Sequence, residues 1–151
     1  MYPFLKINTD AGFDAVTGAT NLGVVIRDSS GLVLVSAVNK LGKAANALYA
    51  KMLGIRYGLQ LACERHYKHL IVETDSRVAL ALIDKGESVM WDAGRLVFDI
   101  MDLVVECIDY MLQYTNREAN SLAHCLAKYD GGWVWYMYGM VLYLSSLCKS
   151  I

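Results

Sequence analysis

Two aspartates each close an apolar run that is typical of a β-strand. Asp10 follows Phe4-Leu5-Lys6-Ile7-Asn8-Thr9, and Asp75 follows Leu70-Ile71-Val72-Glu73-Thr74. A strand that delivers a carboxylate to its own end is an arrangement found in metal sites, because hard cations such as Mg²⁺ take oxygen ligands. An isolated aspartate after a strand is more often a helix cap or a turn residue. The pair therefore points to metal binding only in combination with the rest of the chain.

The segments around the aspartates predict an α/β domain. Three strand-like runs come first, at residues 3–10, 21–28 and 32–40, and the turn at 29–31 makes the last two a hairpin. Apolar residues at three- and four-residue steps predict a helix from 46 to 65 with Asn46 as its N-cap. The later pattern predicts a buried strand at 70–74, helices at 76–85 and 92–109, a strand at 110–115 and a helix from 118. This order implies a mixed sheet with helices on its faces.

Two further segments carry a family resemblance. They are the helical stretch 117–128, Arg-Glu-Ala-Asn-Ser-Leu-Ala-His-Cys-Leu-Ala-Lys, and the turn 27–31, Arg-Asp-Ser-Ser-Gly. Together with Asp10 and Asp75, they resemble the plant branch of the ribonuclease H family, which is often linked to reverse transcriptases. The resemblance spans residues 4 to about 129. For residues 1–130 it implies a ribonuclease H-like five-stranded mixed sheet flanked by helices.

The resemblance also implies an endoribonuclease that cuts RNA–DNA hybrids with two divalent ions, Mg²⁺ or Mn²⁺. Asp10 and Asp75 match the two strand-borne metal ligands, but Lys51 stands where the family's helix carries glutamate, and His124 where its last helix often carries aspartate. An ammonium cannot ligate a metal ion, whereas imidazole can ligate Mn²⁺. Four family carboxylates would carry −4, whereas these four residues carry −1 with neutral histidine. We therefore predict a weakened metal site and impaired two-metal catalysis.

Glu73 offers a rescue for the lost ligand. It lies two residues before Asp75 on one strand, so both side chains point to the same face and Glu73 would supply a carboxylate near the missing one. A solvent-facing or sheet-rim glutamate is the alternative that base rates favour.

The composition limits the partners. The chain of 151 residues fits one domain, and its net charge of −1 gives no global attraction for polyanions, so a nucleic acid must bind a local patch. The resemblance implies recognition of an RNA–DNA hybrid across its minor groove, for which Asn46 and Arg77 are candidate contacts. We expect weak, salt-sensitive binding by a monomer that uses no small-molecule cofactor.

The cysteines and the C-terminal segment bear on location. The four cysteines lie far apart without Cys-x-x-Cys pairs, which favours reduced thiols in a cytoplasmic or nuclear protein. Residues 131–151 form an apolar tail whose first 18 residues carry no charge. That length just reaches a membrane span, so tail anchoring is a minority alternative to a segment packed on the domain.

Two functions remain open from the sequence. The first is a nucleic-acid-binding domain of ribonuclease H type whose activity is impaired by Lys51 and His124. The second is a catalytically dead, retroelement-derived domain used for protein interaction, which Lys51 and the near-neutral net charge favour.

Overall fold

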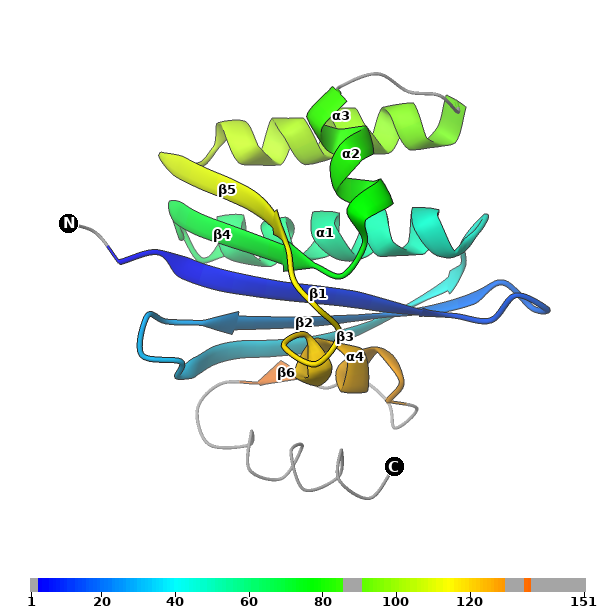
Figure 1. The fold of residues 1–151 in the computed structure, drawn as a ribbon, viewed down its shortest axis with the longest axis horizontal. Helices are drawn as coiled ribbons and strands as arrows, with labels where there is room; N and C mark the ends of the chain where they lie inside the picture. The colour runs from blue at the N-terminus through cyan, green and yellow to red at the C-terminus, as the bar shows by residue number, and fades with distance from the viewer. Residues whose placement is uncertain (1–2, 86–90, 130–134, 137–151) are drawn as a thin grey trace.

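A six-stranded sheet organises the protein in the computed structural model, which describes residues 3–85, 91–129 and the backbone of 135–136 (Figure 1). The sheet order is β5-β4-β1-β2-β3-β6. β1 is antiparallel to β2 and parallel to β4, and β4 is parallel to β5, so the predicted mixed sheet of five strands is confirmed. The sixth strand is a two-residue addition at the β3 edge. The strands are β1 (Leu5–Phe13), β2 (Ala19–Arg27), β3 (Val33–Lys43), β4 (His69–Thr74), β5 (Asp109–Tyr114) and β6 (Trp135–Tyr136).

Helices cover both faces of this sheet. In Figure 1 the helices that precede β5 in the chain lie on one side of the sheet, and the short helix that follows β5 lies on the other. Val24 and Ile26 of β2 face the core under the first helix, whereas Val25 between them packs with Ala123 and Leu126 of the fourth. This alternation is what a strand buried on both faces requires. The helices are α1 (Ala47–Glu64), α2 (Arg77–Lys85), α3 (Trp91–Val105) and α4 (Ser121–Ala127).

Local caps fix where the helices begin. The side chain of Asn46 accepts a hydrogen bond from the Tyr49 amide, as predicted for the N-cap of α1. The hydroxyl of Ser76 accepts one from the Ala79 amide at 3.2 Å and so starts α2. α4 begins at Ser121 and not near residue 118, because the preceding residues form a turn.

β1 differs from its prediction in a way that matters for the site. The strand does not end at Asp10 but continues to Phe13, since β2 pairs with it as far as Thr20. What ends near Asp10 is the pairing with β4, whose last partners are Thr9 and Thr74. Asp10 therefore lies inside a long strand, at the point where its neighbour β4 stops.

The cysteines and the C-terminal segment differ in part from what the sequence predicts. Cys63 and Cys107 are free thiols, whereas Cys125 is disulfide-bonded, so the expectation of reduced thiols is wrong at Cys125. Of the tail, residues 131–134 and 137–151 lie outside the described residues, and 135–136 pair with β3. Among the helices of the described part, none is both long and apolar enough to cross a membrane.

Candidate active site

The parallel pairing of β1 and β4 brings the two aspartates together. Asp75 immediately follows Thr74, the last residue of β4, and Asp10 immediately follows Thr9, the partner of Thr74. Both carboxylates are buried, with 1% of the Asp10 side chain and 7% of the Asp75 side chain exposed. Two buried carboxylates in contact with one cation are the centre of this site.

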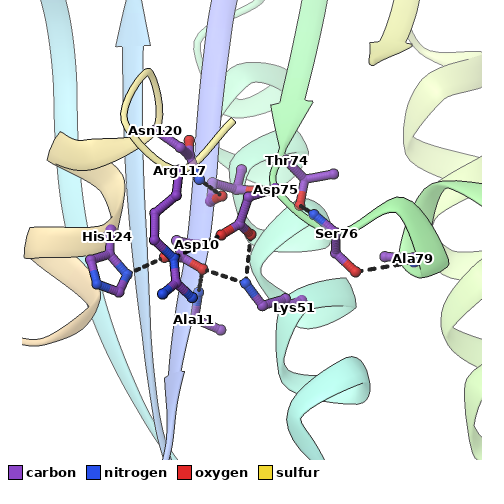
Figure 2. Close-up of polar contacts among 11 residues, drawn as sticks. Asp10, Ala11, Lys51, Thr74, Asp75, Ser76, Ala79, Arg117, Asn120 and His124 are labelled. Carbon is purple, nitrogen blue, oxygen red and sulfur yellow. Dashed lines mark hydrogen bonds and ion pairs between the residues drawn. The ribbon is translucent and has the colours of Figure 1, made fainter. Parts of the chain in front are cut away.

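Lys51 supplies that cation from α1. Its Nζ lies 3.0 Å from Oδ1 of Asp10 and 2.5 Å from Oδ1 of Asp75, so one ammonium joins the two aspartates (Figure 2). Burial alone would lower the pKa of Lys51, but the hydrogen bonds to Asp75 and Asp10 and their charges outweigh it and hold the pKa above its ordinary value. The ammonium is therefore charged at neutral pH.

Nitrogen groups also approach the outer oxygens of the pair. Nδ1 of His124 on α4 lies 2.7 Å from Oδ2 of Asp10, and Nε of Arg117 lies 3.8 Å from Oδ2 of Asp75 (Figure 2). The Ala11 amide donates to Oδ1 of Asp10 at 2.8 Å. Because an ionised carboxylate only accepts hydrogen bonds, the His124 proton resides on Nδ1. All four carboxylate oxygens thus have a nitrogen partner.

Asn120 holds α4 against the aspartate strand. Its side-chain amide donates to the Thr9 carbonyl at 2.9 Å, and its own carbonyl accepts from the His124 amide at 3.0 Å. The residue is almost completely buried. Sequence reasoning used Arg117 and Asn120 as parts of a motif but assigned neither to the site. The signal was their place in the segment that leads into α4.

Glu73 does not join the aspartates. Its Oε2 accepts from Asn8 at 2.8 Å, and its Oε1 accepts from Gln113 at 2.7 Å and pairs with Lys6 at 3.1 Å. Burial would raise the pKa of Glu73, but these donors outweigh it and lower the pKa. With 6% of the residue exposed, the prediction of a solvent-facing glutamate is wrong. Because both oxygens are engaged in this interstrand bridge, the contacts also do not support the rescue role.

The predicted nucleic-acid contacts have structural partners of their own. Asn46 caps α1 through the Tyr49 amide. The Arg77 guanidinium carbon lies 3.7 Å from the centre of the Tyr114 ring, which is a cation–π contact between α2 and β5. Neither contact connects these residues to Asp10 or Asp75.

Comparison with known proteins places this site in a family. Residues 8–130 match the family model described as "Reverse transcriptase-like". The chain belongs to this reverse transcriptase-like family. The chain is also similar to the "Putative ribonuclease H protein At1g65750" of Arabidopsis thaliana, with 30% identity over 133 residues, or 83% of this chain. The chain spans only 20% of that relative's length.

Solved structures show the fold of this reverse transcriptase-like chain to be that of ribonuclease H. RNase H1 from the archaeon Halobacterium salinarum NRC-1 superposes with a TM-score of 0.76 at 17% identity, covering 81% of this chain and 92% of that one. The N-terminal RNase H domain of rv2228c from Mycobacterium tuberculosis gives 0.75 at 22% identity, covering 83% and 91%. LC11-RNase H1, isolated from compost and solved with an RNA/DNA hybrid, gives 0.71 at 20% identity, covering 81% and 92%.

The side chains of this site do not fit a pair of divalent ions. The inner oxygens of Asp10 and Asp75 are joined by an ammonium, and His124 directs a proton, not a lone pair, at Asp10. Among the residues that the structure describes, no group of three or more His, Cys, Asp or Glu side chains is arranged to hold a metal ion. Two divalent ions need several oxygen ligands and little positive charge beside them. Here an ammonium already contacts both aspartates, so the positive charge is high where the ions would bind.

Proposed function

We propose that this chain is a nucleic-acid-binding domain of the ribonuclease H type that recognises RNA–DNA hybrids and whose cleavage activity is impaired. The observation that carries the proposal is the Lys51 ammonium between Asp10 and Asp75. The fold is that of the similar ribonuclease H proteins, one of which, LC11-RNase H1, was solved in complex with an RNA/DNA hybrid. What differs is the charge at the reacting centre.

In this proposal, Asp10 and Asp75 match the family's ligands for Mg²⁺ or Mn²⁺, but Lys51 weakens the metal site that they would otherwise form. The Lys51 ammonium already lies 3.0 Å from Oδ1 of Asp10 and 2.5 Å from Oδ1 of Asp75, so a divalent ion on these oxygens would lie close to a like charge, which repels it strongly in a partly buried site. His124 contacts Asp10 without adding negative charge. Cleavage that depends on two ions is therefore impaired by both positions.

We further propose that the nucleic acid contacts this domain through Asn46 and Arg77 on the rim. Arg77 already stacks on Tyr114, so its guanidinium is held near the start of α2. Because the net charge is −1, binding depends on few phosphate contacts and weakens as salt rises. We assign this function to residues 1–130 of a cytoplasmic or nuclear protein, with 131–151 as an appended segment.

Cleavage of a labelled RNA–DNA hybrid in Mg²⁺ and in Mn²⁺ tests the proposal. We expect the native chain to bind the hybrid at low salt without cleaving it, and the Lys51→Glu, His124→Asp double variant to cleave at least about 100-fold faster, since metal charge is worth several kcal/mol in such reactions. Asp10→Asn added to the double variant is the control and should abolish the gain.

Two outcomes contradict separate parts of the proposal. Cleavage by the native chain at the rate of the double variant, abolished by Asp10→Asn, would show that Lys51 and His124 do not impair the site. Failure of the folded native chain to bind the hybrid at low salt would refute the nucleic-acid function itself.

The β5 edge of the sheet favours a second function, protein interaction by a catalytically dead domain of retroelement descent. β5 ends the sheet order, and Met111 on it and Ile108 before it are 53% and 70% exposed. An open strand edge with apolar side chains is a surface to which another protein adds readily. A folded chain that does not bind hybrid would leave this function as the better account.

A further inference from the structure

The two buried aspartates of this site are arranged around one cation. Asp10 and Asp75 meet at Nζ of Lys51, and their side chains are 1% and 7% exposed. Two ionised carboxylates so placed repel each other unless positive charge lies between them. In the ribonuclease H relatives that the sequence resembles, metal ions would supply that charge. Here the chain supplies it from its own α1.

The positive charges at this site balance the negative charges of the two aspartates. The two aspartates carry −2, and Lys51 with Arg117 carries +2, so the cluster is neutral with His124 uncharged. A divalent ion bound beside Lys51 would leave an excess of +2 in a partly buried site. Binding would instead require Lys51 to leave its two carboxylate partners, with loss of both hydrogen bonds.

We propose that Lys51 is the permanent cation of this site, in place of a metal ion, and that the native chain consequently holds no divalent ion at Asp10 and Asp75. A second consequence rests on the proposed function: hybrid binding by the native chain is independent of divalent ions. The proposal also predicts a latent metal site. Replacement of Lys51 by glutamate would leave three carboxylates beside His124, which is a ligand set suited to one Mn²⁺ ion.

Thermal unfolding in EDTA and in Mn²⁺ tests the first statement without any nucleic acid. We expect the melting temperature of the native chain to change by less than about 1 °C between the two conditions. Lys51→Glu should melt at a lower temperature in EDTA, because three carboxylates then lack a cation, and should gain about 5 °C or more in saturating Mn²⁺. Asp10→Asn in the Lys51→Glu background should remove the gain.

Arg95→Glu is the matched control for the change in charge. Arg95 is exposed on α3, and its replacement by glutamate changes the net charge by the same two units as Lys51→Glu. We expect this variant to show no response to Mn²⁺ beyond that of the native chain. An equal response in Arg95→Glu and Lys51→Glu would attribute the effect to overall charge and overturn the assignment.

Direct Mn²⁺ binding by electron paramagnetic resonance keeps the test decisive if Lys51→Glu does not fold. Native chain that binds no Mn²⁺, or binds it equally well after Asp10→Asn, supports the proposal. Native chain whose bound Mn²⁺ is lost on Asp10→Asn overturns it.

Hybrid binding is then measured for the native chain in EDTA and in Mg²⁺. Equal affinities within twofold support metal-independent binding, and a tenfold or greater loss in EDTA contradicts it. Absence of binding in both buffers would refute the proposed function while the Mn²⁺ results still decide the role of Lys51.

Discussion

Gly23→Ala tests how closely α4 must sit on the sheet to place His124. A Cβ at Gly23 of β2 would lie 2.2 Å from the Ala123 carbonyl oxygen and 2.6 Å from the Ala127 amide nitrogen, both in the backbone of α4. To reach an ordinary contact of 3.4 Å, the Ala123 carbonyl would have to move by 1.2 Å. Backbone cannot yield as a flexible side chain does. We therefore expect a loss of about 2–3 kcal/mol in the free energy of unfolding, at the upper end of overpacking effects.

The same displacement acts on the site. Nδ1 of His124 lies 2.7 Å from Oδ2 of Asp10. A shift of α4 by about 1 Å away from β2 would lengthen this distance beyond that of an ordinary hydrogen bond. Urea denaturation measures the stability, and the imidazole resonances of His124 report the contact. A loss of about 2–3 kcal/mol corresponds to a fall of about 4–12 °C in melting temperature for a domain of this size.

Gly54→Ala is the control for this experiment. Gly54 lies in α1, where a Cβ would be 3.3 Å from the Asp10 carbonyl oxygen, close to an ordinary contact. Alanine also favours the helix interior over glycine by about 1 kcal/mol, so this variant should be as stable as the native chain or more stable. If Gly23→Ala is no less stable than Gly54→Ala, the close packing of α4 on β2 is refuted.

Variants at two further positions separate structural from functional roles. Glu73 has a lowered pKa, despite burial that opposes it, so its stabilising contribution is complete above its ordinary pKa of 4.5 and is lost as the pH falls through the folded value. Glu73→Gln should therefore lose less stability than the native chain as the pH is lowered from about 4.5 in urea denaturation, and equal losses would show that the contacts with Asn8, Gln113 and Lys6 do not stabilise the ionised carboxylate. Asn46→Ala should cost about 1 kcal/mol through loss of the α1 cap, whereas Asn46→Asp should keep the stability. A loss of hybrid binding in Asn46→Asp alone would then report a direct contact of Asn46 with nucleic acid.

The order of elements was predictable because its signals are local. Apolar alternation marks the first three strands, and the three- and four-residue spacing after Asn46 marks α1, so each boundary fell within a few residues of the structure. The end of β1 was predicted at Asp10, too early in the chain. Its continuation to Phe13 depends on pairing with β2 as far as Thr20, which no pattern within residues 3–13 reveals. Strand length is set by the partner as much as by the strand.

The sequence predicted that four residues would meet, but it did not predict their contacts or the parts played by Arg117 and Asn120. Asp10, Asp75, Lys51 and His124 do converge, because the β1 and β4 pairing and the two helices bring them to one place. Which oxygen each nitrogen would take depends on side-chain geometry, and so does the engagement of Glu73 by donors from β1 and β5. A sequence gives the residue types on a face but not the competition among them for hydrogen bonds.

The charges at this site determine how much metal binding and cleavage a single substitution can restore. Lys51→Glu would give three carboxylates against the one guanidinium of Arg117, a charge of −2 that one divalent ion neutralises. Adding His124→Asp brings a fourth carboxylate, and only then does the negative charge approach that of two ions. The single variant should consequently bind one ion and remain poor at cleavage, because one ion cannot stabilise both the attacking and the leaving oxygen. On the proposed function, restoring cleavage therefore requires both the Lys51→Glu and the His124→Asp substitutions.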